Sequence, residues 1–183
     1  MTGAKLPPPV SDTPWSAEFV MQSLEVLPLF ERDGVLCWLQ PQHAASLRVG
    51  ARPGIAPGHL AVETLARYGL RPFLVHSTSW RQEGDRIILT YAATVHEGDV
   101  TPDGPLHARR IGHVELARGG VASAPPSIAV EQVVEHALRH LSWLVKDDPV
   151  VGDELSSWRS ILGTYQPEPF RNLSADTIGR SHV

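Results

Sequence analysis

The chain has 183 residues, 42% hydrophobic and 20% charged, which is enough for one domain with a sizeable core and too few for two comfortable ones. Its formal net charge of -4 excludes a global positive field that would attract nucleic-acid polymers or acidic membranes. The lone Cys37 cannot form an internal disulfide, and no apolar stretch reaches the length of a membrane span or resembles a signal peptide, so we expect a cytoplasmic protein.

The N-terminal stretch predicts a tail followed by a helix. Residues 1–12 contain three consecutive prolines and little apolar material, which is typical of a flexible tail. A Thr-Pro pair at 13–14 is typical of a helix start, because the hydroxyl can cap the helix and proline suits its first turn. Apolar residues then follow at helical spacing, namely Trp15, Phe19, Val20 and Leu24. We therefore expect one domain over residues 13–170, opening with a helix that ends before Pro28.

The next segments predict two strands and an amphipathic helix. Residues 34–40 and 45–51 are short, rich in apolar side chains and bounded by Gly or Pro, as strands often are. Residues 57–68 place four side chains on one helical face, namely Leu60, Thr64, Leu65 and Tyr68. Gly69 follows at the position where a left-handed residue commonly ends a helix, so the helix has one buried face and a defined end.

A β-hairpin is expected in the middle of the chain. Residues 73–80 and 86–95 have the composition of strands, and Glu83-Gly84-Asp85 between them is a strong turn signal. Both faces of the second strand carry apolar or small residues, so we expect that strand to be central in its sheet. A long loop over residues 96–107 follows the hairpin.

The C-terminal half predicts one more strand and two helices. Residues 108–118 read as a strand that carries charges of both signs, which is typical of an exposed edge strand. Residues 128–146 carry a single apolar stripe, which predicts a long helix. A second helix over residues 151–163 would form a helical hairpin with it, against the sheet or at a subunit contact. The polar residues 171–183 predict a loose C-terminal tail.

The order of elements over Arg48–Val95 resembles that of Nudix domains. The stretch LARYGLRPFLVHSTSW, residues 65–80, is similar to the end of that family's catalytic helix and the extended segment after it. Members of the family are hydrolases of nucleoside diphosphates linked to another group. The resemblance implies an α/β (α+β) fold, a Nudix-like α/β/α sandwich with a mixed sheet and a C-terminal helical hairpin.

The family's catalytic box is degenerate in this chain. When its end is anchored on Gly69-Leu70, the two closing glutamates, which supply most of the magnesium coordination in the family, fall on Ala66 and Arg67. Only Glu63 remains among its acids. The glycine, first glutamate and arginine of the box fall on Arg48, Gly54 and Val62. Because magnesium requires several hard oxygen ligands, the resemblance implies the fold without the family's metal-dependent catalysis.

The first strand of the hairpin carries the predicted ligand site. Strand alternation places His76, Thr78 and Trp80 on one side, where an imidazole and a hydroxyl beside an indole could line a pocket for a planar ring. Arg81 follows and could bind a phosphate or a carboxylate with two nitrogens. The same segment could also be a sheet face that satisfies its own hydroxyl groups.

Several acids and histidines could bind a metal, and each has a simpler alternative role. Glu63 is the only candidate for a catalytic residue. It lies four residues after His59, so the two share a helical face and could form half of a metal site or a solvent-facing pair. Glu97 and Asp99 could supply a displaced metal site or be solvated in the long loop. His136 and His140 lie one helical turn apart and could chelate a metal ion together. Alternatively, they could belong to a polar helix face or to an interface.

We therefore expect a Nudix-like protein that lacks the usual metal box and binds a nucleotide-type or other small ligand rather than hydrolysing it, without a cofactor. It could form a homodimer through its C-terminal helices. The alternative is a magnesium-dependent pyrophosphohydrolase with a metal site displaced to Glu63, Glu97 or Asp99. A structural or interaction protein with an empty pocket is the third hypothesis.

Overall fold

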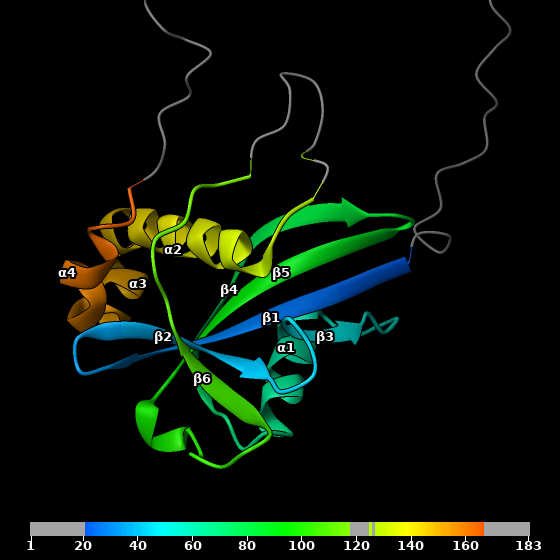
Figure 1. Ribbon diagram of the computed structural model, residues 1–183, viewed down its shortest axis with the longest axis horizontal. Coiled ribbons are helices and arrows are strands. Elements are labelled where there is room, and N and C mark those ends of the chain that lie inside the picture. The colour runs from blue at the N-terminus through cyan, green and yellow to red at the C-terminus, as the bar shows by residue number, and fades with distance from the viewer. Residues whose placement is uncertain (1–20, 118–124, 126, 167–183) are drawn as a thin grey trace, which may run out of the picture.

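The computed structural model describes residues 21–117, 125 and 127–166 (Figure 1). The predicted tails over 1–12 and 171–183, and the first part of the predicted N-terminal helix, lie outside these residues. The described strands are β1 (Met21–Arg32), β2 (Val35–Pro41), β3 (Leu47–Gly50), β4 (Pro72–Glu83), β5 (Arg86–Val95) and β6 (Leu106–Arg110). The described helices are α1 (Pro57–Ala66), α2 (Val130–Asp147), α3 (Pro149–Glu154) and α4 (Arg159–Leu162), with 3-10 turns at Glu97–Asp99 and Ser156–Trp158. None of these helices has the length and apolar character needed to cross a membrane.

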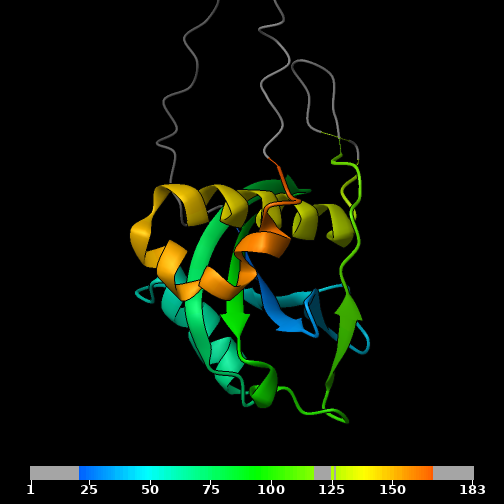
Figure 2. The ribbon, with the colours of Figure 1, turned by 90° about the vertical axis from the view of Figure 1, so that its left-hand side faces the viewer.

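The strands form one open mixed sheet with helices on both faces, which confirms the predicted fold class. The strand order is β4-β5-β1-β2-β6, and β3 pairs with β1. β1 and β5 run parallel, while the other pairs are antiparallel. Figures 1 and 2 show α2 lying across one face of the sheet and α1 on the other. Because β1 and β5 have neighbours on both sides and helices above and below, they form the centre of the core.

The predicted helix before Pro28 is wrong over its described part, because Met21–Arg32 form strand β1. Both faces of β1 are buried: Leu24 packs in the cluster beneath α1 and Leu27 in the cluster beneath α2. A strand that is buried on both faces has apolar residues at many spacings, including helical ones, so periodicity alone misleads. Pro28 lies where the antiparallel partner of β1 changes from β3 to β2. Proline has no backbone N–H to donate, and this break between the two ladders tolerates it.

The middle of the chain confirms the predicted helix and hairpin. Helix α1 buries Leu60, Thr64 and Leu65, and Gly69 ends the turn that follows with φ 74°. β4 and β5 pair across Gly84, which has φ 60° and therefore a conformation that favours glycine. The predicted edge strand is confirmed in position, since β6 lies at the end of the sheet, but its ladder stops at Arg110.

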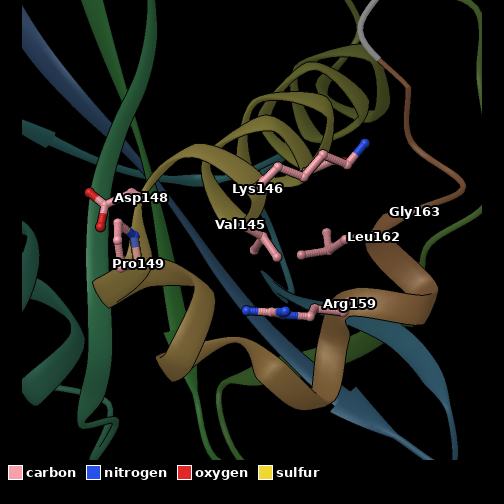
Figure 3. A pocket seen from close by; sticks show the side chains of 8 residues that line it. Val145, Lys146, Asp148, Pro149, Arg159, Leu162 and Gly163 are labelled. Carbon is pink, nitrogen blue, oxygen red and sulfur yellow. The ribbon is translucent and has the colours of Figure 1, made fainter.

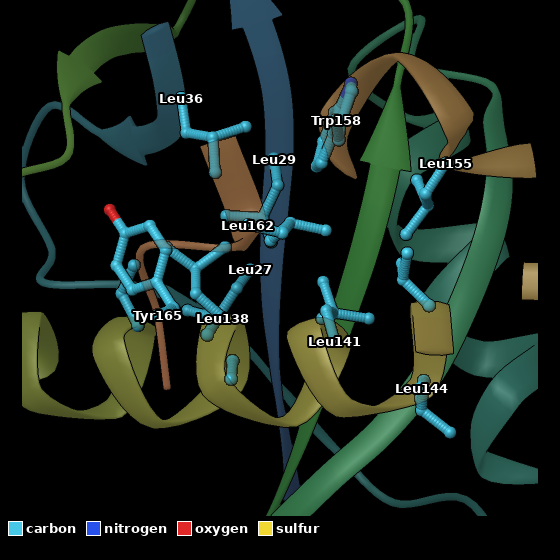
Figure 4. Packing of buried hydrophobic residues seen from close by; sticks show 14 of the residues in the cluster. Leu27, Leu29, Leu36, Leu138, Leu141, Leu144, Leu155, Trp158, Leu162 and Tyr165 are labelled. Carbon is cyan, nitrogen blue, oxygen red and sulfur yellow. The ribbon is translucent and has the colours of Figure 1, made fainter. Parts of the chain in front are cut away.

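The C-terminal helices pack against the sheet, which is one of the two placements the sequence allowed. α2 is the predicted long helix. The predicted second helix is broken into α3, a 3-10 turn and α4, because the chain turns back at Leu155 to place further side chains in the core. Figure 4 shows this cluster, formed by leucines from β1, β2 and α2 together with Leu155, Trp158, Leu162 and Tyr165.

Candidate functional site

The residues predicted to line a ligand site do not share one face of β4. His76 pairs with Ala92, whereas Trp80 pairs with Leu89. Because Ala92 and Leu89 are three residues apart on a regular strand, they point to opposite faces, and so do their partners. The prediction that His76, Thr78 and Trp80 lie on one side is wrong, because a β-bulge at Thr78 adds one residue and reverses the alternation after it.

Thr78 and Trp80 also differ in their surroundings. Thr78 is buried, and its hydroxyl donates to the backbone carbonyl of Thr90 at 3.4 Å. Trp80 is 69% exposed, so its indole is available to solvent rather than held in the core. This hydrogen bond fits the alternative hypothesis for Thr78, in which the sheet itself satisfies the hydroxyl and no ligand is involved.

A buried carboxylate on β1 organises the polar side chains beside the hairpin. Glu25 is 0% exposed. Arg81 donates to it from both terminal nitrogens, Nη1 to Oε2 at 2.7 Å and Nη2 to Oε1 at 3.0 Å. Ser46 Oγ donates to Oε1 at 2.6 Å, and Thr90 Oγ1 donates to Oε2 at 3.3 Å. Both carboxylate oxygens of Glu25 are therefore satisfied by the protein itself.

Two further charged residues complete this set, which we call the Glu25 cluster (Glu25, Ser46, Arg48, Arg81, Glu83 and Thr90). Arg48 on β3 donates to Glu25 Oε1 at 3.2 Å and to Glu83 Oε2 at 2.7 Å. Arg81 Nε donates to Glu83 Oε1 at 2.9 Å. Two carboxylates thus balance two guanidinium groups. The carboxylates that Arg81 meets are the protein's own, so its role in ligand binding stays a prediction.

The electrostatics of the Glu25 cluster favour its ionised form. Burial by itself raises the pKa of the Glu25 carboxyl, but hydrogen bonds from Arg81 and Ser46 and the charges of Arg81 and Arg48 bring the pKa below its ordinary value. The hydrogen bond from Arg48 likewise lowers the pKa of Glu83. The cluster therefore holds its charges at neutral pH and has no proton to exchange there.

The sequence carries a partial signal for this cluster. Glu25 is the only acid in the apolar run SLEVLPLF, residues 23–30, and a carboxylate buried within such a run needs a charged or hydrogen-bonding partner. Its partner Arg81 is 56 residues away along the chain, and the two meet only through the sheet. Spacing along the sequence could not have identified that pair.

His76 contacts a residue that the sequence placed in a different group. Its Nε2 lies 3.1 Å from Nε2 of His140 on α2, with the two imidazole centroids 5.1 Å apart. Trp143 lies next to His140, at 5.7 Å between ring centroids. His136, the predicted chelating partner of His140, is exposed one turn earlier on the helix. The structure therefore joins β4 to α2 through two imidazoles.

The acids proposed for a displaced metal site are each paired with an arginine. Glu63 pairs with Arg52 and Glu97 with Arg32. Asp99 lies 3.3 Å from Arg71. Across residues 21–117, 125 and 127–166, no group of three or more His, Cys, Asp or Glu side chains converges on one point that could hold a metal.

A cleft of about 420 Å³ lies between α2 and the α3–α4 segment. Figure 3 shows Val145 and Leu162 facing each other across it, with Lys146 and Arg159 extending along its sides. Its lining also includes Ser142, Asp148, Pro149 and Gly163. Both apolar and charged side chains therefore line one cleft, so a small molecule there would meet apolar surface and charged groups together.

The polar groups of this cleft are less satisfied than those of the Glu25 cluster. Ser142 is 1% exposed, and its hydroxyl is the one buried side-chain polar atom in the described residues that has no hydrogen-bond partner. Arg159 Nη2 donates to the backbone carbonyl of Gly152 at 3.1 Å, which holds the guanidinium beside the cleft. Asp148 Oδ1 accepts from the amides of Val150 and Val151, so this carboxylate caps α3.

Comparison with known proteins gives little guidance on function. No family model and no curated protein matches the chain. Among solved structures, the solution structure of the E. coli ORF135 protein is similar, with 20% identity over 54% of this chain and 71% of that one. The TM-score of 0.32 is too low to carry an argument about fold or activity.

Proposed function

We propose that this protein binds a nucleotide-type or other small anionic molecule in the α2–α3–α4 cleft and does not hydrolyse it. The observation that carries the proposal is that the cations Lys146 and Arg159 line the cleft beside Ser142, whose buried hydroxyl has no partner among the described residues. A buried hydroxyl without a hydrogen bond costs about 1–3 kcal/mol, and a ligand recovers that free energy when the Ser142 side chain turns its hydroxyl toward the cleft.

The cationic side chains of the cleft favour an anionic ligand group. Within the described part of the chain, neither Lys146 nor Arg159 forms an ion pair with an acidic side chain. The acid in the lining, Asp148, already accepts two backbone hydrogen bonds at the start of α3. A phosphate or carboxylate could therefore accept from Ser142 and from one cation while its apolar part contacts Val145 and Leu162.

The non-hydrolytic part of the proposal depends on the degenerate Nudix-like box. Glu63 is its one remaining acid, and that carboxylate forms an ion pair with Arg52. Ala66 and Arg67, at the positions of the family's principal magnesium ligands, offer no carboxylate oxygen. These features support a Nudix-like domain that has kept the architecture and uses another surface for binding.

A thermal-shift screen without added metal tests this proposal. Nucleotides, sugar phosphates and small carboxylates should include at least one compound that raises the melting temperature, because a ligand that binds only the folded state stabilises it by mass action. S142A and R159Q should each remove that shift. The matched controls are S160A and R67Q, which change exposed residues outside the cleft and should keep it.

Two results would contradict the proposal. One is a screen in which no anionic compound moves the melting curve, which would favour a structural or interaction protein. The other is a shift that survives both S142A and R159Q, which would place the ligand elsewhere on the molecule. A homodimer through the C-terminal helices stays a prediction, and sedimentation of the purified protein would test it.

A further inference from the structure

We propose that His76 and His140 together hold one late first-row transition-metal ion, of the zinc, nickel or copper class, at the junction of β4 and α2. This proposal goes beyond ligand binding in the cleft and does not depend on it. Imidazole nitrogens are preferred ligands for these metals, whereas magnesium and calcium prefer oxygen.

The distance between the two ring nitrogens fits a shared ion. Nε2 of His76 and Nε2 of His140 lie 3.1 Å apart. Two metal–nitrogen bonds of about 2.0–2.1 Å that meet at roughly 90–110° place the nitrogens roughly 2.9–3.4 Å apart. The pair is therefore already at the separation that one metal ion imposes on two adjacent ligands, so little rearrangement is needed to bind it.

The position of the pair in the fold also suits a metal. β4 is an edge strand of the sheet, and α2 crosses the sheet face beside it. Both histidines are only partly buried, so an ion can reach them from solvent. No third His, Cys, Asp or Glu converges on them in the described residues. Solvent or a small ligand would therefore fill the remaining coordination positions.

The protonation state of the pair supports the same role. Burial lowers the pKa of His76 and of His140, and the neighbouring imidazoles lower that of His140 further. Both rings are then neutral near pH 7, and the neutral imidazole is the form that binds a metal. The competing explanation is a metal-free hydrogen bond in which one ring donates to the other, because 3.1 Å also fits that contact.

Titration of the full-length protein with zinc, followed by calorimetry, tests this proposal. We expect one equivalent to bind at the pair and to raise the melting temperature, because the ion would bridge two elements of the fold. H76Q and H140Q should each weaken binding at least about tenfold, since each removes one of two protein ligands. Copper should also quench the fluorescence of Trp143, which lies beside His140.

Two control variants separate this site from others among the nine histidines. H136Q distinguishes the β4–α2 pair from a chelate formed by His136 and His140 within one helix, and H107Q removes an exposed histidine elsewhere. Both should bind zinc as the unmodified protein does. If H136Q abolishes binding while H76Q keeps it, or if neither H76Q nor H140Q changes the isotherm, the proposed site is refuted. Melting curves in EDTA show whether each variant is folded, and either of the two ligand variants suffices for the decision.

Discussion

The Glu25 cluster and the α2–α3–α4 cleft are two polar regions of one small domain, and they differ in whether their buried polar groups form hydrogen bonds. In the first, a fully buried carboxylate receives hydrogen bonds from two arginines and two hydroxyls. In the second, a buried hydroxyl receives and gives none within the described residues. A satisfied network stabilises the fold, whereas an unsatisfied group costs stability unless something binds to it. The Glu25 cluster is therefore a structural feature of the fold, and the cleft is the region that we propose for binding.

The largest expected effect is the loss of the buried charge at Glu25. E25Q leaves the guanidinium of Arg81 largely buried without its main carboxylate, so we expect a decrease in the free energy of unfolding of about 3–5 kcal/mol. Urea denaturation followed by circular dichroism measures it. A decrease below about 1 kcal/mol would show that the cluster is not what holds β1, β3 and β4 together.

The same carboxylate predicts a loss of stability in acid. Because the pKa of folded Glu25 lies below its unfolded value of about 4.5, its contribution is fully present above pH 4.5 and disappears as the pH falls through the folded pKa. Unfolding free energies measured between pH 7 and pH 3 should therefore decrease below about pH 4.5. E25Q should flatten this dependence, and an unchanged slope in the variant would attribute the acid sensitivity to other carboxylates.

At the cleft we expect a substitution to raise the free energy of unfolding, whereas E25Q lowers it. S142A removes a buried hydroxyl that has no partner in the described residues, so we expect the unbound protein to gain about 1 kcal/mol in unfolding free energy. The same variant should lose ligand binding, which would separate stability from function at one atom. If S142A destabilises the unbound protein, the hydroxyl has a partner after all, and the contrast between the two regions fails.

The smallest effect is expected at Glu63. Its side chain is 50% exposed and its ion pair with Arg52 is at the surface, so E63Q should change the unfolding free energy by less than about 1 kcal/mol. It should also leave the behaviour of the protein toward nucleoside diphosphates unchanged, with no turnover in magnesium or manganese before or after the change. Metal-dependent turnover that E63Q abolishes would instead establish the hydrolase alternative.

Local pattern predicted much of the fold, and its failures have identifiable causes. The hairpin around Gly84 and helix α1 followed from turn chemistry and helical spacing, which depend on neighbours along the chain. The segment before Pro28 was assigned the wrong structure because a strand buried on both faces shows no period of two. One bulge at Thr78 was enough to separate His76 from Trp80, and no residue in that stretch marks it.

The sequence by itself determined most of the strands and helices, the presence of a single acid on helix α1, and the presence of a lone carboxylate in an apolar run. Only the tertiary structure decided that Glu25 meets Arg81, that His76 meets His140, and that Ser142 lies at a cleft with no hydrogen-bond partner for its hydroxyl in the part of the chain that the structure describes. The physical reason is that backbone conformation depends on nearby residues, whereas the pairing of buried polar groups depends on which distant segments the sheet and helices bring into contact.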